Sequence, residues 1–181
     1  MLYVGTGENY SSPANDTSDA LIAFRLKDGA MVWHAQKTAN DAWNVACMLP
    51  DNPNCPKENG PDVDFGASTI VLRDAKRGDL LLAGQKSGWV YGVNPDARGK
   101  IVWSSKVGRG GIQGGVHFGM ATDGERLFAL VEGDVPGEEE NPPARQQRLI
   151  GHRREHRMRL ETQLARQSRH AVARHHVVVR L

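Results

Sequence analysis

Three charged residues stand in short segments rich in turn-forming residues, where a side chain is free to do chemistry. Glu8 and Asp41 carry carboxylates, which act as general bases or bind hard cations such as Ca²⁺. Lys86 carries an ammonium, which stabilises negative charge that develops on a reacting group. Each of the three also fits a turn at the end of a strand. Residue type alone therefore leaves both interpretations open.

Two cysteines, Cys47 and Cys55, bracket a seven-residue stretch rich in proline and asparagine. They can close a small disulfide loop in an oxidising compartment, or they can remain free thiols. They do not form a Cys-x-x-Cys-His haem motif, and two cysteines by themselves cannot build a structural zinc site. His117 has no second histidine at metal-ligand spacing, so we expect it to be structural.

The overall composition excludes several classes of protein. The chain has 181 residues, a net charge of +2 and 39% hydrophobic residues, which is typical of one globular domain. It is not a collagen, a disulfide-dense miniprotein or a wholly disordered chain. No apolar run approaches the roughly 18 residues of a membrane span. The N-terminus shows no basic region followed by a long apolar run, so we expect no signal peptide in this chain.

Two stretches of the chain repeat one plan: a strand, a tight turn, and a second strand that ends in tryptophan. Residues 23–33 turn at Asp28-Gly29, and residues 92–103 follow the same plan with one extra residue. An Asp-Gly pair between alternating apolar residues is a strong hairpin signal. Further short strands are expected around the two units, at residues 2–5, 69–73, 80–84, 89–93 and 127–131.

Many short strands with glycine-rich turns, and no helical periodicity over residues 1–135, indicate an all-β fold. The repeated Trp33 and Trp103 favour a β-propeller, in which each four-stranded blade reuses one aromatic packing position. Extra residues between the two units map to a loop at 44–65. The chain holds about two to three blades, whereas a propeller closes with four to eight. We therefore expect a partial propeller, a piece of a larger protein.

Three further segments carry a resemblance to a known family. Residues 5–9 resemble a Gly-Thr/Ser-Gly-Asn-Pro strand end, residues 36–44 resemble a Gln-x-Thr-Pro-x-Asp-x-Trp-Asp loop, and residues 85–91 resemble a Lys-x-Gly-aromatic strand. Together with the tryptophan repeat, they resemble the propeller of pyrroloquinoline quinone (PQQ)-dependent quinoprotein alcohol dehydrogenases. The segment 114–119 is similar to the polyvinyl-alcohol-dehydrogenase-like branch. The resemblance covers about residues 1–135.

The resemblance implies roles for the charged residues. Asp41 matches the family's catalytic Asp, which takes the hydroxyl proton of the alcohol while hydride moves to PQQ. Glu8 stands where the family places an Asn that binds Ca²⁺, and Asn9 is the alternative match; either residue offers an oxygen ligand. Lys86 matches the family's lysine that contacts the quinone oxygens. The family's later Asp of the loop is Asn44 here.

The resemblance also bears on the aromatic residues and the cysteines. Trp43 and Trp89 are candidates to wall the flat cofactor, although tryptophan in this pattern also packs blades together. The family's periplasmic setting favours a disulfide between Cys47 and Cys55. That pair is not the adjacent cysteine pair of some family members.

The composition of the chain changes near residue 135. We assign residues 1–135 to the partial propeller, 136–144 to a linker and 145–181 to an Arg/His-rich tail. The tail holds ten arginines against two acidic residues, and it lacks Lys, Trp, Tyr and Phe, so disorder or a partial helix is expected. Its composition is also typical of GC-rich codons read out of frame. A basic arm for nucleic acid is a further interpretation, but nucleic acid is not the expected partner.

The resemblance implies a fragment of a quinoprotein dehydrogenase that oxidises an alcohol with PQQ and Ca²⁺. Its electrons would pass to a cytochrome c, because the chain has no haem motif of its own. The parent protein would be periplasmic, whereas this chain, with no visible leader, would stay cytoplasmic and inactive by itself. The alternative is a non-catalytic propeller that serves as a protein-binding scaffold. The ordered set of Glu8, Asp41 and Lys86 favours the dehydrogenase, since a scaffold has no need of all three.

Overall fold

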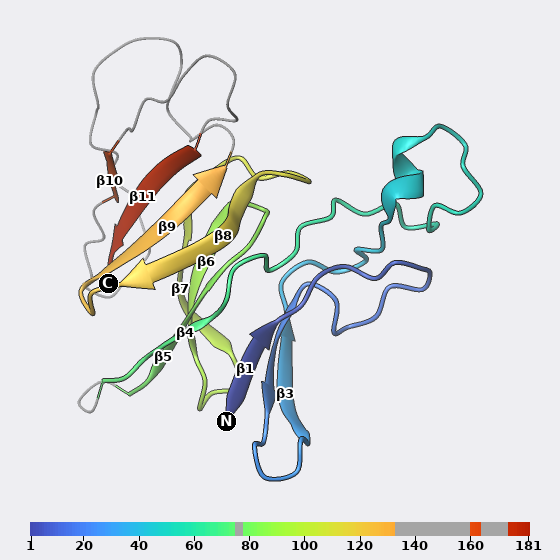
Figure 1. Ribbon diagram of the computed structural model, residues 1–181. Helices are drawn as coiled ribbons and strands as arrows, with labels where there is room; N and C mark the ends of the chain where they lie inside the picture. Colours follow the sequence, from blue (N-terminus) through green and yellow to red (C-terminus); the bar gives the residue numbers. More distant parts are fainter. Residues whose placement is uncertain (75–77, 133–159, 164–173) are drawn as a thin grey trace.

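The computed structural model describes residues 1–74, 78–132, 160–163 and 174–181, and these residues form an almost entirely β structure (Figure 1). The one helix in this part of the chain is a single 3₁₀ turn, η1 (Val45–Met48). The strands are β1 (Leu2–Gly5), β2 (Ala20–Phe24), β3 (Met31–Gln36), β4 (Ile70–Leu72), β5 (Leu80–Gly84), β6 (Trp89–Asn94), β7 (Lys100–Lys106), β8 (Gly115–Thr122), β9 (Arg126–Glu132), β10 (Leu160–Gln163) and β11 (Arg174–Arg180).

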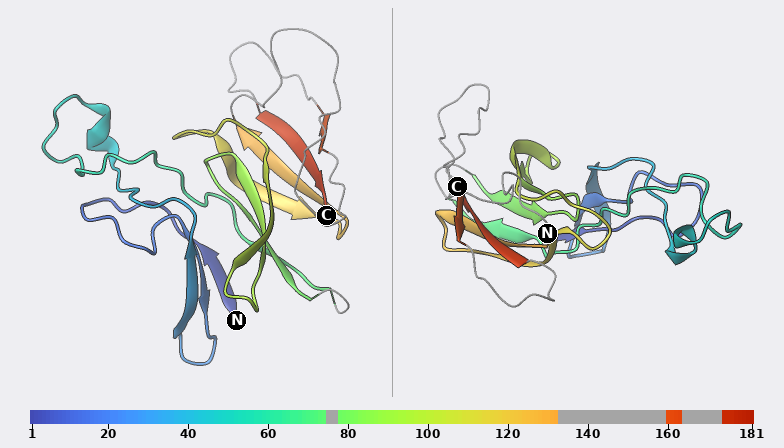
Figure 2. Two further views of the ribbon diagram at one scale, coloured as in Figure 1. Left: turned by 180° about the vertical axis from the view of Figure 1, so that it is seen from behind. Right: turned by 90° about the horizontal axis from the view of Figure 1, so that it is seen from above.

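The strands form three antiparallel sheets. The first sheet has the order β1-β2-β3, and the middle sheet has the order β4-β5-β6-β7, in which each strand pairs with its neighbour in sequence. The third sheet has the order β10-β11-β9-β8. A four-stranded meander is the blade of a propeller. The middle sheet is therefore one complete blade, and the other two sheets lie on either side of it (Figure 2).

The two tryptophan-ended units occupy equivalent places in adjacent sheets. Residues 23–33 form the β2–β3 hairpin and residues 92–103 form the β6–β7 hairpin, and each pairing has a register shift at the same point of the unit. Gly29 and Gly99 both adopt φ +71°, the left-handed conformation that the two turns require. Trp33 is 4% exposed, and its indole N–H donates to the carbonyl of Pro95 in the next hairpin at 3.1 Å. The repeat thus connects one blade to the next.

Two hydrophobic cores lie on the two faces of the middle sheet. On β5, Leu81 and Ala83 pack toward the first sheet, whereas Leu82 packs toward the third sheet. This alternation follows from the two-residue period of a strand. The described sheets stack face to face without closing into a ring. The all-β fold and the partial propeller predicted from the sequence are confirmed.

The described parts of the tail differ from the expectation of disorder or partial helix. Residues 160–163 and 174–180 are strands, and β11 pairs with β9 along seven residues. Val177 and Val179 are fully buried in the core with Leu127 and Val131. The physical reason is that β9 presents an apolar face and an unpaired edge, which a strand with three consecutive valines can cover, because the first and third of them face the core. The predicted linker 136–144 and the rest of the tail lie outside the described residues.

The long connection between β3 and β4 projects away from the sheets and carries η1 (Figures 1 and 2). Cys47 and Cys55 form a disulfide within it, with Cα atoms 4.7 Å apart. Asn44 caps η1 by accepting a hydrogen bond from the amide of Ala46, and its side-chain amide donates to the carbonyls of Tyr10 and Asn54. These bonds give the projecting segment a defined shape without strands of its own.

Candidate functional site

A cluster of charged side chains forms where three connections meet. Glu8 follows β1, Asp62 and Asp64 lie in the segment before β4, and Lys86 lies in the turn between β5 and β6. The ammonium of Lys86 donates to Asp62 Oδ1 at 2.7 Å and to Asp64 Oδ2 at 2.9 Å. The side chains of Lys86 and Asp62 are only 5% and 6% exposed. The sequence predicted Glu8 and Lys86 for one site, and the fold brings them to the same pair of aspartates.

Glu8 completes the acidic side of this cluster. One carboxylate oxygen from each of Glu8, Asp62 and Asp64 lies within 4.8 Å of the other two. The backbone amide of Glu8 also donates to Asp64 Oδ1 at 3.0 Å. The pKa of Glu8 is raised to about 8, first by burial and then by the hydrogen bond with Asp64 and the charges of Asp64 and Asp62. Glu8 therefore holds a proton near neutral pH unless a cation takes its place.

Lys86 and Asp62 have raised pKa values, whereas the pKa of Asp64 is lowered. Burial opposes the charge of Lys86, but the hydrogen bonds and charges of Asp62 and Asp64 raise its pKa, so it stays protonated. Burial acts to raise the pKa of Asp64 as well, yet hydrogen bonds from Glu8 and Lys86 lower it. For Asp62 burial prevails, and its pKa is raised despite Lys86. Asp62 is thus the more basic carboxylate of the pair.

Asp41 lies next to this cluster and is completely buried. Its Oδ1 accepts from the amide of Asp62, and its Oδ2 accepts from the amide of Val63, both at 3.1 Å. Asp62 has a φ of +54°, which costs a non-glycine residue backbone strain. The carboxylate of Asp41 therefore holds the strained segment that presents Asp62. Its catalytic role stays a prediction, with both of its oxygens bonded to backbone.

Asp19, directly before β2, is a buried residue that no motif of the sequence indicated. It is 0% exposed, and no backbone amide or other N–H group of the described structure donates to its carboxylate. Its pKa is raised to about 8, first by burial and then by the charges of Asp41 and Asp64 and a side-chain hydrogen bond with Asp41. Asp62 and Asp64 were missed as well. Their signal was the i, i+2 spacing before Phe65, which places two carboxylates on one side of an extended segment.

The remaining predicted site residues are not in the charged cluster. Asn9 pairs with Ala42 in an isolated bridge, and its side-chain oxygen accepts from the amide of Asn15 at 2.8 Å. Trp43 is half-buried, and its amide donates to the carbonyl of Asn9. Trp89 is 36% exposed and stacks on Tyr91 at 6.5 Å between ring centroids. Among the aromatic contacts of the described residues, there is no stacking between the rings of Trp43 and Trp89.

A glycine-rich loop positions the backbone of Lys86. The amide of Gly111 donates to the carbonyl of Lys86 at 3.1 Å, and the amide of Lys86 donates to the carbonyl of Asp64 at 2.8 Å. Gly115, with a φ of +70°, packs directly against that same Lys86 carbonyl, so a Cβ has no room there. The loop therefore fixes the turn from which the ammonium reaches the aspartates.

We expect Gly115→Ala to destabilise the chain by about 3 kcal/mol, from the left-handed backbone together with the clash against Lys86. Gly29→Ala is the matched control, because Gly29 has a φ of +71° but open space around it, and should cost about 1 kcal/mol. Urea unfolding of the two variants measures the difference. Equal losses would show that the packing on Lys86 adds nothing to the backbone strain.

We also expect the cation-free chain to lose stability as the pH rises. The pKa values of Glu8 and Asp19 rise from the ordinary 4.5 and 3.8 to about 8 on folding. The folded state then binds more protons than the unfolded state, so this stabilisation is full below the ordinary values and is lost as pH rises through about 8. Urea unfolding near pH 5 and near pH 9 measures it. Asp19→Asn should flatten the dependence, while Asp16→Asn should leave it unchanged; a slope of the opposite sign contradicts the prediction.

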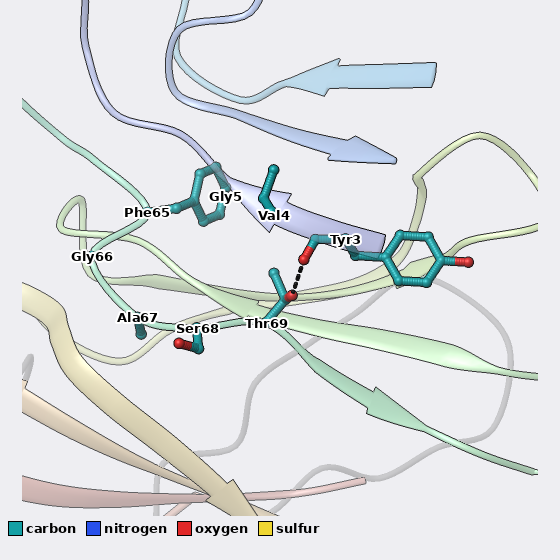
Figure 3. A pocket seen from close by; sticks show the side chains of 8 residues that line it. All are labelled: Tyr3, Val4, Gly5, Phe65, Gly66, Ala67, Ser68 and Thr69. Atoms are coloured by element: carbon teal, nitrogen blue, oxygen red, sulfur yellow. Dashed lines mark hydrogen bonds between the residues drawn. The ribbon is translucent and has the colours of Figure 1, made fainter. Parts of the chain in front are cut away.

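A pocket of about 340 Å³ lies beside β1 (Figure 3). It is lined by β1 residues Tyr3 to Gly5 and by residues 65–69. The hydroxyl of Thr69 donates to the carbonyl of Tyr3 at 3.1 Å and joins its two walls. The lining holds no carboxylate and no ammonium, so this pocket offers little to an ionic or catalytic reaction.

Comparison with known proteins gives two curated relatives. A polyvinyl alcohol dehydrogenase of Pseudomonas sp. is 37% identical over 133 residues, and one of Sphingopyxis sp. (strain 113P3) is 35% identical over 133 residues. Each alignment covers 72% of this chain and 20% of the relative. No family model matches the chain. No solved structure matches it.

The short span of the alignments along the relatives agrees with a fold that is only part of a propeller. In the described part of the chain, no helix has the length and hydropathy needed to cross a membrane. The chain spans about one fifth of the length of the relatives that it matches. Its three sheets form an arc of propeller blades rather than a closed ring. In sequence, the chain is therefore related to the polyvinyl alcohol dehydrogenases, as a segment about one fifth of their length.

Proposed function

We propose that this chain supplies one part of the active site of a PQQ- and Ca²⁺-dependent alcohol dehydrogenase. The observation that carries the proposal is the cluster of Glu8, Asp62, Asp64 and Lys86, assembled from three separate connections, in which Asp62 and Lys86 are buried and Glu8 and Asp64 are half-buried. A scaffold gains nothing from withdrawing three carboxylates from solvent around one ammonium, because buried charges cost stability. Active sites are where such arrangements are maintained.

The donor set fits a calcium ion. Ca²⁺ prefers carboxylate oxygens and tolerates flexible geometry, and Glu8, Asp62 and Asp64 offer three such groups close together. The raised pKa of Glu8 indicates that its surroundings disfavour the ionised form of the carboxylate when no cation is nearby. Glu8 was the predicted metal ligand, and the two aspartates join it in the proposal. Asn9 is a weaker candidate, since its side-chain oxygen is bonded within its own loop.

PQQ, when bound beside Ca²⁺, supplies the acceptor for the hydride of the alcohol carbon. In this chain, Lys86 is the residue to orient it, because its ammonium has three donors and the two aspartates occupy two of them. Trp43 and Trp89 are proposed as walls only within a longer protein, where further blades complete the cavity. The chain alone is proposed to be inactive.

The geometry favours Asp62 over Asp41 as the base that accepts the hydroxyl proton. The oxygens of Asp41 both accept backbone amides, whereas Asp62 has a carboxylate oxygen beyond the one bonded to Lys86. Its raised pKa makes Asp62 a better proton acceptor than an exposed aspartate. Asp41 then acts by holding Asp62 in place. The substrate is proposed to be an alcohol, the electron acceptor a cytochrome c, and the compartment the periplasm.

A segment exchange tests this proposal. The matching segment of the Sphingopyxis relative is replaced by residues 1–132 of this chain, and PQQ- and Ca²⁺-dependent oxidation of polyvinyl alcohol is measured. We expect Asp62→Asn to reduce kcat about a hundredfold with PQQ binding retained. Asp96→Asn, at an exposed turn, is the control and should leave kcat unchanged. A folded exchange protein that binds neither PQQ nor Ca²⁺ would favour the scaffold instead.

A further inference from the structure

We infer that the ammonium of Lys86 occupies the place where a divalent cation binds, so that the cation and the ammonium exchange at Asp62 and Asp64. The inference rests on the proposed function, because it needs a cation at the charged cluster. It adds a conformational step to that site. The cation binds where Lys86 leaves the aspartates, and its binding frees the ammonium for another partner.

The ammonium and a cation use the same carboxylates. Lys86 Nζ lies 2.7 Å from Asp62 Oδ1 and 2.9 Å from Asp64 Oδ2. Both aspartates also belong, with Glu8, to the group of three carboxylates whose oxygens lie within 4.8 Å of one another. Ca²⁺ binds its oxygen ligands at about 2.3–2.6 Å, so an ion held by both aspartates would lie next to the ammonium. Two positive charges at such a separation repel each other, and solvent screens them little where the side chains are buried.

Both carboxylate oxygens of Asp64 already accept a hydrogen bond. Its Oδ1 accepts the backbone amide of Glu8 at 3.0 Å, and its Oδ2 accepts the ammonium of Lys86. The amide of Glu8 belongs to the main chain and cannot turn away without moving the segment after β1. The ammonium stands at the end of a flexible four-carbon stem. Of the two donors, Lys86 is therefore the one that a cation displaces.

Only the side chain of Lys86 has to move in this exchange. Its backbone amide donates to the carbonyl of Asp64 at 2.8 Å, and its carbonyl accepts from the amide of Gly111 at 3.1 Å. Gly115 packs against the same carbonyl. The turn therefore stays in place while the stem rotates, and the two donors that now hold Asp62 and Asp64 become available to a bound ligand.

The exchange predicts that Lys86 lowers the affinity of the cluster for cations. A site that its own ammonium fills most of the time binds a ligand in proportion to the fraction that is free. We expect Lys86→Met to bind Ca²⁺ about tenfold more tightly than wild type, measured by calorimetry on the 181-residue chain. Lys27→Met is the control, because it removes the same charge at an exposed residue and should bind Ca²⁺ as wild type does.

The reactivity of Lys86 in the wild-type chain shows whether the ammonium leaves the aspartates. Reductive methylation with formaldehyde and cyanoborohydride, followed by peptide mass spectrometry, gives the rate at each lysine. Lys86 should react slowly while it is bonded to two carboxylates with its side chain only 5% exposed. We expect saturating Ca²⁺ at constant ionic strength to raise this rate about tenfold, and to leave the rate at Lys27 unchanged. The measurement needs no variant, so it decides the matter even if Lys86→Met does not fold.

The outcomes separate this inference from the proposed function. If Ca²⁺ binds while the reactivity of Lys86 stays unchanged, the ammonium remains on the aspartates, and the inference is overturned while the cation site stands. A Lys86→Met variant that binds Ca²⁺ no more tightly than wild type also overturns it, because the ammonium then does not compete. If neither chain binds Ca²⁺, the cation site itself is removed, and with it the calcium part of the proposed function.

Discussion

Val177→Asp is expected to destabilise the chain by about 4 kcal/mol, because it places an unpaired carboxylate in the core between the middle and third sheets. Val177 is fully buried there, beside Leu127, Ala129 and Val131. Typical domains are stable by about 5–15 kcal/mol, so a loss of this size detaches β11 or unfolds the third sheet. Urea unfolding followed by circular dichroism measures the change. Hydrogen exchange at β9 shows whether the loss is local.

Val178→Asp is the matched control, since the neighbouring residue points to the other face of β11 and is only half-buried. We expect it to cost less than about 1 kcal/mol. The comparison also decides whether the Arg/His-rich tail takes part in the fold. If both variants kept the wild-type stability, β11 would not be seated on β9, and the earlier expectation of a disordered tail would be restored.

The fold was predictable because its main signals are local. Trp33 and Trp103 mark the same position in two hairpins, and Asp28-Gly29 fixes one of the two turns. The strands of the tail were not predictable, because nothing in the sequence around Val177 indicates a partner. That partner is the free edge of β9, which is visible only after the third sheet is assembled. Long-range pairing overrode a composition that favoured disorder.

The site was partly predictable for a similar reason. Motifs pointed to Glu8 and Lys86, and the fold brings both to the same aspartates. Asp62 and Asp64 follow a long loop, and only the folded chain shows that this loop returns to β1 and β5. Asp41 was predicted as the base from its motif, and the structure adds that its carboxylate accepts hydrogen bonds from the backbone of that returning segment. The catalytic role of Asp41 stays a prediction, and these bonds could not be predicted because they join residues that the loop separates in the sequence.

Lys86→Met is expected to cost the chain about 3–5 kcal/mol near neutral pH, because it leaves two aspartates without their counter-ion. The pair Lys86–Asp62 is almost fully buried, at 5% and 6% side-chain exposure, so solvent screens it little. Methionine matches the length of the lysine stem, which limits any loss of packing. Lys27→Met, at an exposed residue, is the control and should be within about 0.5 kcal/mol of wild type.

The pH dependence of Lys86→Met distinguishes a lost ion pair from a packing defect. Lys86 lowers the pKa of Asp64, a stabilisation that is present above the ordinary value of 3.8 and lost as pH falls below it. The variant and wild type should therefore converge in acid, where the aspartates take up protons, and diverge toward neutral pH. Ca²⁺ should restore part of the lost stability, since a cation bound at the cluster replaces the missing ammonium by mass action. A constant difference at all pH values, with no effect of Ca²⁺, would mean that Lys86 serves packing alone.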